Sequence, residues 1–153
     1  MKNYASLVAT AFLASTLTTM AAEKKIDASA LPPAVQITVK EQSKGAAIKG
    51  YSTERENGRT VYEAEMIVDG HSKDIQIAED GTLNEVEEEV PFATLPAKVQ
   101  EALTAKARGA KITKVESLKK QDKLVAYEAA TLKGTKKGEI QVGPEGGKLS
   151  HAE

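Results

Sequence analysis

The chain has 153 residues, of which 28% are charged and 41% hydrophobic, with a formal net charge of −1, so its composition is that of an ordinary globular protein. The lack of cysteine excludes disulfides, thiolate metal sites and cysteine nucleophiles, and 2 histidines offer little acid–base chemistry. Without a basic excess, we expect no nucleic-acid partner. We therefore expect a protein that is not an enzyme and needs no cofactor.

The first segment, residues 1–22, has the pattern of a secretory signal peptide. Lys2 precedes an uncharged stretch, residues 3–22, which has an apolar centre and ends in small residues. We expect cleavage after Ala21 or Ala22 and a secreted or periplasmic mature protein. A membrane anchor is the alternative, because such a stretch is long enough to span a bilayer. Ser and Thr dilute its apolarity, so we expect no stable span after cleavage.

The rest of the chain contains an internal repeat. The matching blocks, 64 or 65 positions apart, are 31–36 and 95–100, 45–48 and 109–112, 62–64 and 127–129, and 74–77 and 139–142. The blocks keep their order, and their spacing slips only in turns. We therefore infer a duplication, with one repeat at residues 23–90 and the other at residues 91–153.

Each repeat is predicted to begin with one helix. Pro32 and Pro96 mark the helix starts, where a missing backbone N–H costs nothing. Gly45 and Gly109 lie just past the expected helix ends. Apolar residues four positions apart lie between these signals, as the buried side of a short helix requires.

After each helix, alternating apolar and polar residues predict an antiparallel meander. In the first repeat we expect strands at residues 60–69 and 73–78, with Asn57-Gly58 and Asp69-Gly70 in tight hairpin turns. A short fourth strand stays open, and weak alternation at residues 111–118 leaves that strand uncertain or bulged. The fold class is therefore α+β: two tandem helix-plus-antiparallel-meander repeats of order α-β-β-β, whose sheets either pack together or join edge to edge.

One face of this sheet is expected to lie under the helices and the other to be free. The expected buried residues are Tyr62, Ala64, Met66, Val68, Ile75 and Ile77 with Val35, Val39 and Ile48, then Val125, Tyr127, Ala129, Ile140 and Val142 with Val99, Leu103 and Ile112. The expected partner-binding residues of the free face are Tyr51, at its margin, and Glu63, Glu65, Gln76, Glu128, Glu139 and Gln141. If that face is concave, it suits a basic peptide or protein. A merely solvated sheet face is the alternative.

The repeated Leu-Pro-x-x-Val at Leu31 and Leu95, and the repeated Tyr-Glu-Ala at Tyr62 and Tyr127, resemble the PepSY-like family of exported bacterial proteins. The likeness covers residues 31–149. It implies a fold similar to the tandem-repeat beta-lactamase inhibitor protein, whose concave sheet surface meets an enzyme. It also implies kinship with PepSY domains in propeptides of secreted metallopeptidases. The expected function is thus an exported, non-enzymatic binding protein that engages a polypeptide or enzyme of the cell envelope, such as a peptidase that it restrains.

A second hypothesis concerns four acidic residues near turns: Asp69, Asp74, Glu79 and Asp80. Carboxylate oxygens suit calcium, but this spacing fits no twelve-residue calcium loop, so we expect no metal site. A small-ligand or calcium-binding sensor of the cell envelope stays as the alternative function.

The second repeat contains two lysine pairs, and the first ends in an acidic run. Lys119-Lys120 and Lys136-Lys137 follow the glutamates of residues 85–89 along the chain. We expect either a basic edge that opposes this run or solvated lysines that guard sheet edges. The oligomeric state stays unknown.

Overall fold

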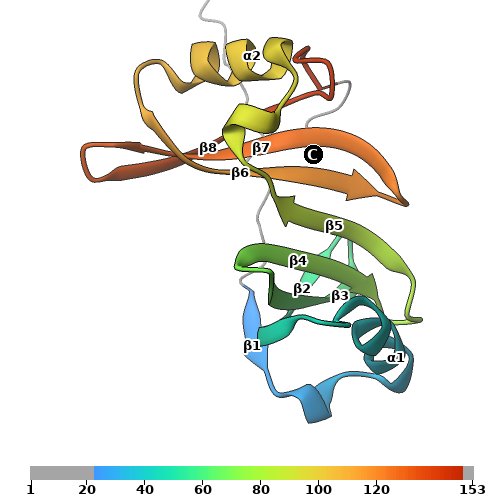
Figure 1. Cartoon of the computed structure of the whole chain (residues 1–153). Helices are drawn as coiled ribbons and strands as arrows, with labels where there is room; N and C mark the ends of the chain where they lie inside the picture. Colours follow the sequence, from blue (N-terminus) through green and yellow to red (C-terminus); the bar gives the residue numbers. More distant parts are fainter. Residues whose placement is uncertain (1–22, 150–153) are drawn as a thin grey trace, which may run out of the picture.

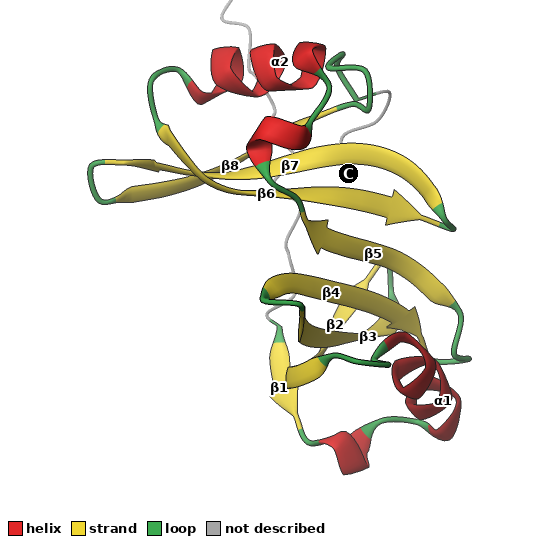
Figure 2. Ribbon diagram, in the orientation of Figure 1, coloured by secondary structure: helices red, strands yellow, loops and turns green. Residues whose placement is uncertain are grey.

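The computed structural model describes residues 23–149, so the signal-peptide prediction lies outside the described residues. Two helices, α1 (Pro33–Gln42) and α2 (Ala97–Ala107), pack on one antiparallel sheet (Figure 1, Figure 2). The strands are β1 (Lys24–Ile26), β2 (Ala47–Glu56), β3 (Arg59–Val68), β4 (His71–Ala78), β5 (Leu83–Glu89), β6 (Lys111–Lys120), β7 (Lys123–Lys133) and β8 (Lys136–Val142). No helix in the described part combines the length and apolarity needed to cross a bilayer.

The α+β prediction is confirmed, and the two meanders join edge to edge. All 8 strands lie in chain order in one sheet, and β5 of the first repeat pairs with β6 of the second. The first repeat therefore has the fourth strand that the sequence left open. Strand β1, which pairs with β2 at the outer edge of the sheet, was not predicted. The sheet is open, because β1 and β8 end it without pairing to each other.

Each helix covers its own half of the sheet and closes its own core. Val35 and Val39 of α1 pack with Ala64, Met66, Ile75 and Ile77. Val99 and Leu103 of α2 pack with Val115, Ala129 and Val142. Alternation placed these side chains under the helices except for Val115, which was not predicted; it also placed Val125 there, which is only partly buried. Burial of this apolar surface is the main stabilising contribution for both halves.

The repeat also preserves one close backbone contact against each helix. Gly81 and Gly146 have φ angles of +89° and +77°, and each lies against the start of a helix. A Cβ atom would lie 2.9 Å from the Ala34 carbonyl oxygen at Gly81, and 2.5 Å from that of Lys98 at Gly146. Both the left-handed backbone and the lack of space therefore require glycine at these two positions.

A β-bulge near the start of β2 corrects one sequence prediction. The β2–β3 register shifts between Ile48 and Gly50, and the β6–β7 register shifts at the matching place, between Ile112 and Lys114. An extra residue reverses the alternation that follows it. Tyr51 therefore packs partly buried against the first core, under the helix, and its expected place on the free face is wrong.

The expectation that apolar side chains gather only under the helices is also wrong in part. Val61, Leu118 and Ala126 lie on the opposite face by strand register, yet they are only 5%, 3% and 1% exposed. Leu118 pairs with Glu87 on one side and with Ala126 on the other. Apolar side chains are thus also buried on the face away from the helices, in both repeats.

Candidate binding face

Strand pairing gathers polar side chains of both repeats on the side away from the helices. Directly paired residues in antiparallel strands point to the same face. Glu63 pairs with Gln76, which pairs with Glu85. In the second repeat, Glu128 pairs with both Glu116 and Gln141. We call this surface the acidic face; it consists of Glu54, Glu63, Glu65, Asp74, Gln76, Glu85, Glu87, Glu116, Glu128, Glu139 and Gln141 with Lys114 and Lys120.

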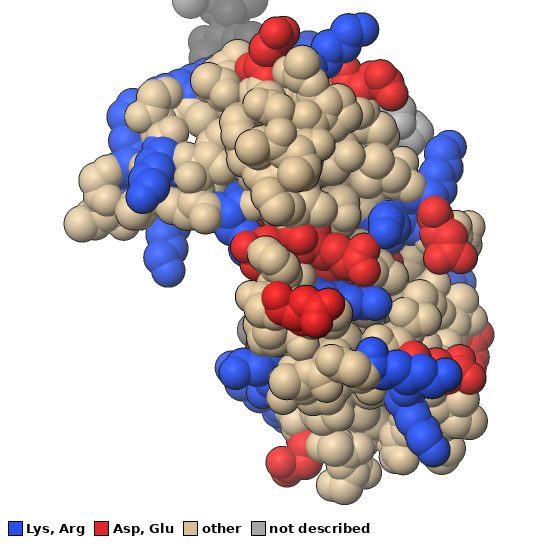
Figure 3. Space-filling view, in the orientation of Figure 1, with Lys and Arg blue, Asp and Glu red and all other residues tan. Residues whose placement is uncertain are grey.

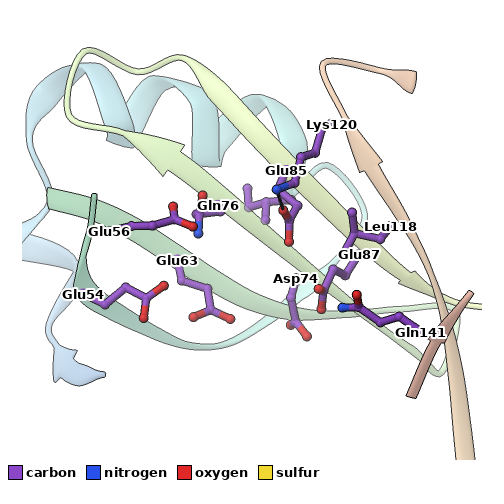
Figure 4. Close-up of a pocket in the computed structure, with 11 residues that line it drawn as sticks. Glu54, Glu56, Glu63, Asp74, Gln76, Glu85, Glu87, Leu118, Lys120 and Gln141 are labelled. Atoms are coloured by element: carbon purple, nitrogen blue, oxygen red, sulfur yellow. Dashed lines mark ion pairs between the residues drawn. The ribbon is translucent and has the colours of Figure 1, made fainter. Parts of the chain in front are cut away.

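The acidic face is hollowed where the two repeats meet. The hollow has a volume of about 260 Å³ and is lined from both halves of the sheet. Figure 4 shows Glu54, Glu63 and Asp74 of the first repeat projecting into the same open space as Gln141 of the second. Neither repeat alone provides the whole lining.

Hydrogen bonds and ion pairs hold the side chains of this face in place. Ser52 is buried and its Oγ donates to Glu63 Oε2 at 3.1 Å. The Gln141 amide donates to the Glu128 carboxylate. Lys120 Nζ lies 3.2 Å from a carboxylate oxygen of Glu85.

A second group of bonds lies at the junction, where the Ser72–Glu116 and Lys119–Glu88 contacts connect the two repeats. Glu116 is only 6% exposed, and its Oε1 accepts from Ser72 Oγ at 3.1 Å and from Lys114 Nζ at 2.7 Å. The Ser72 backbone N–H donates to Glu89 Oε2 at 3.1 Å. On the helix side of the same junction, Lys119 Nζ lies 2.8 Å from Glu88 Oε2. The predicted opposition of lysines and the acidic run is thus confirmed for the first lysine pair.

Burial and mutual repulsion raise the pKa of Glu54 and, by a larger amount, the pKa values of four further carboxyl groups on the acidic face. Burial is the main cause for each of them. It raises the pKa of Glu63 to about 6, and burial with the neighbouring Glu116 charge raises the pKa of Asp74 to about 6. Burial and a hydrogen bond with Glu139 raise the pKa of Glu128 to about 7.

Glu87 shows the largest of these changes. Burial, then the charges of Glu85, Glu128 and Glu116, raise the pKa of Glu87 to about 8. These groups exchange protons near neutral pH, because a charged form that is both desolvated and repelled is disfavoured. The charge of the acidic face therefore depends on pH between about 5 and 8.

Three of these carboxylates converge closely enough to share a cation. Oxygens of Asp74, Glu87 and Glu116 all lie within 4.8 Å of one another. Hard cations such as Ca²⁺ prefer oxygen ligands of this kind. Of the four residues in the calcium hypothesis, only Asp74 belongs to this group. Asp80 instead caps its own turn, where its Oδ1 accepts from the Thr82 backbone N–H at 2.9 Å.

Six of the seven residues expected to bind a partner lie on the acidic face, namely Glu63, Glu65, Gln76, Glu128, Glu139 and Gln141. Their role in binding stays a prediction. Three further residues of the acidic face were not predicted from the sequence: Glu85, Glu87 and Glu116. Glu85 and Glu87 are two positions apart, so alternation would have placed both on the free face if a fourth strand had been assumed there.

Comparison with known proteins identifies the fold. The chain matches the family model described as "Putative beta-lactamase-inhibitor-like, PepSY-like" at residues 17–83 and again at residues 60–142. A solved structure titled a "putative periplasmic" protein from Bacteroides eggerthii is 20% identical, with a TM-score of 0.62, over 77% of this chain and 85% of that one.

Two further solved structures have the same fold. A BLIP-like protein from Bacteroides fragilis is 24% identical, with a TM-score of 0.54, over 77% of this chain and 82% of that one. A DUF2874 family protein from Bacteroides ovatus is 18% identical, with a TM-score of 0.59, over 78% and 85% of the two chains. No protein with curated annotation matches the sequence. The two family matches cover both helix-and-meander units, so the chain belongs to the PepSY-like, beta-lactamase-inhibitor-like family.

Proposed function

We propose that this protein is an exported, non-enzymatic binding protein of the cell envelope whose acidic face receives a basic segment of a polypeptide partner. The observation that carries the proposal is the convergence of carboxylates from both repeats on one hollow. Export is supported by the signal-peptide pattern and by the similar structure from Bacteroides eggerthii, which is titled a "putative periplasmic" protein. The partner is a protein such as an envelope enzyme or peptidase, which the bound chain restrains.

Electrostatics favours a basic partner over an apolar one. Acidic groups outnumber the two lysines of the face, and both lysines already lie against carboxylates, in the Lys114–Glu116 and Lys120–Glu85 pairs. A complementary charge speeds encounter and selects the partner, even where its net contribution to affinity is small. An arginine or lysine of the partner would also stabilise the ionised form of the carboxyl groups whose pKa is raised.

Binding is therefore expected to strengthen as the pH rises. A basic segment binds the ionised carboxylates better, so each group that gives up a proton on binding contributes up to tenfold in affinity per pH unit while it titrates. Titration of a labelled Lys-rich peptide at about pH 6 and about pH 8, followed by fluorescence anisotropy, measures this. A Glu-rich peptide of equal length is the control ligand.

Charge reversal tests the face itself. Glu63→Lys with Glu128→Lys places one cation on each half of the acidic face. Glu41→Lys with Glu101→Lys makes the same change in net charge on the exposed sides of α1 and α2. We expect the first pair to reduce peptide affinity at least about tenfold and the second pair to change it less than about twofold. Equal losses in both variants would contradict the proposal.

A second candidate function rests on the carboxylate group of Asp74, Glu87 and Glu116. A divalent cation there would make the protein a calcium-binding sensor, and its binding would displace the Glu87 proton. Calorimetric titration with Ca²⁺ in two buffers of different ionisation enthalpy would detect that proton. A binding heat that is absent, or that persists in Glu87→Gln, would exclude this candidate.

A further inference from the structure

A group of cations gathers at the end of the second repeat, far from the acidic hollow along the strands. Lys133 and Lys136 pair across the β7–β8 turn, and Lys137 and Lys111 both pair with Leu132. Lys133 Nζ reaches the Arg108 carbonyl oxygen, at 3.4 Å. We call this group the basic end; it consists of Arg108, Lys111, Lys133, Lys136 and Lys137. All five residues are exposed.

The basic end has few acidic neighbours: Glu139, which follows Lys137 on the same face of β8, lines a hollow with it, at the border with the acidic face. Residues 102–115 and 129–138, which build it, contain neither Asp nor Glu. Within residues 23–149, none of its five cations forms an ion pair with a carboxylate, whereas Lys73, Lys114, Lys119 and Lys120 all do. Figure 3 shows the same separation, with Lys and Arg gathered at the left end, where the β7–β8 hairpin projects. The five cations of this end therefore outnumber Glu139, the carboxylate beside Lys137, and leave a net positive potential.

The shape of the basic end selects the kind of partner. The β7–β8 hairpin extends past α2 (Figure 1). By strand register, Lys133 and Lys136 lie on one face of the hairpin and Lys137 lies on the other. Such a projection does not enclose a peptide, and residues 102–115 and 129–138 contain no aromatic side chain on which nucleic-acid bases could stack. A convex cluster of lysines makes the most contacts with a broad anionic surface whose charged groups can move laterally.

We propose that the basic end docks on the phosphate-bearing surface of an anionic lipid bilayer. The proposal rests on the export part of the proposed function, because export brings the protein to such surfaces, and it is independent of what the acidic face binds. Gly134 and Thr135 occupy the hairpin tip, so the tip has no large apolar side chain to insert. The attachment is consequently electrostatic, reversible and sensitive to salt.

Each lysine near an anionic membrane strengthens attachment about fivefold. The test uses the full chain and co-sedimentation with vesicles of phosphatidylglycerol and phosphatidylcholine in about a 1:2 ratio, compared with phosphatidylcholine alone. The apolar stretch at residues 3–22 affects both kinds of vesicle, so the measured quantity is the ratio of the two partition coefficients. The test variant replaces four residues, Lys111→Gln, Lys133→Gln, Lys136→Gln and Lys137→Gln.

A matched control makes the same net-charge change in the first repeat, with Lys24→Gln, Lys40→Gln, Lys44→Gln and Lys49→Gln, all at exposed positions. We expect the anionic preference to fall at least about tenfold in the test variant and less than about threefold in the control. Raising the NaCl concentration from about 50 mM to about 300 mM should abolish the preference of the wild type for anionic vesicles. Unchanged circular dichroism and Tm in both variants establish that each is folded.

Several outcomes would overturn the proposal. If the preference for anionic vesicles falls equally in the test and control variants, net charge alone determines binding. If the wild type shows no preference for anionic vesicles, the basic end does not dock on them. Displacement by inorganic phosphate at constant ionic strength would point to a site for free phosphate. Self-association that disappears in the test variant would assign the basic end to a second copy of the chain. None of these results touches peptide binding at the acidic face, so the two proposals fail separately.

Discussion

Neutralising Glu87 should stabilise the protein in alkaline solution. Its carboxyl group lies between Asp74 and Leu118 in the sheet, and burial with the charges of Glu85 and Glu128 raises its pKa from the usual 4.5 to about 8. A group whose pKa is higher in the folded state favours folding at low pH. That contribution is full below about pH 4.5 and is lost by the time the pH has risen through about 8.

The size of the effect follows from the pKa difference. A shift from 4.5 to about 8 corresponds to an upper bound of about 5 kcal/mol, at about 1.36 kcal/mol per pKa unit. The side chain is only partly buried and water screens it, so we expect about 2 kcal/mol. Glu87→Gln should thus unfold at a Tm higher by roughly 6–10 °C at pH 8, and at nearly the wild-type Tm near pH 4.5.

Glu88 provides an internal control, because its pKa is lowered whereas that of Glu87 is raised. It points to the helix side, where hydrogen bonding to Lys119, and then the charges of Lys119 and Lys73, lower its pKa. Its contribution is present above the unfolded pKa and is lost as the pH falls, so Glu88→Gln should destabilise the protein at pH 8 by less than about 1 kcal/mol. Urea unfolding of both variants across pH checks this. Parallel pH profiles for the wild type and Glu87→Gln would refute the reasoning.

Other substitutions test the core and the repeated glycine contact, each by urea unfolding. Leu103→Ala should cost about 2–5 kcal/mol because Leu103 is 0% exposed in the second core, whereas Ile37→Ala, at a side chain that is 61% exposed, should cost less than about 0.5 kcal/mol. Gly146→Ala should cost more than about 2 kcal/mol, since its Cβ would strike the Lys98 carbonyl oxygen, while Gly134→Ala, with φ of +63° but open space, should cost only about 1 kcal/mol. Equal losses within either pair would contradict the packing described here.

Local signals in the sequence predict most of the fold correctly. The φ angles of Asn57 and Gly58, 49° and 79°, are those of the tight hairpin turn that the dipeptide predicts. Pro32 and Pro96 lie at the N-caps of their helices, as expected. The sequence left open whether the two sheets pack together or join edge to edge, because the residues of β5 and β6 do not specify which strand each pairs with. Strand pairing of this kind depends on contacts between distant residues.

The candidate site was predicted less completely, for a geometric reason. A single extra residue beside Gly50 moved Tyr51 under the helix and brought Ser52 to the free face, where it bonds Glu63. The matching bulge before Lys114 brought Glu116 to the same face. Alternation counted from Ile48 did not reveal the shift in β2, whereas the weak alternation at residues 111–118 already left that strand uncertain or bulged, and the bulge in β6 is confirmed. Paired contacts across strands were needed to see the shift in β2.

The continuous hydrogen bonding between β5 and β6 has an evolutionary consequence. An ancestral unit with one helix and one meander would have carried a bare strand edge and, to bury it, would have needed a twin molecule. Gene duplication put both twins on one polypeptide, after which mutation no longer had to alter them identically. Both halves contribute carboxylates to the shared seam, whereas the cations of the basic end all belong to the second half, an asymmetry that a symmetric pair of identical chains cannot acquire.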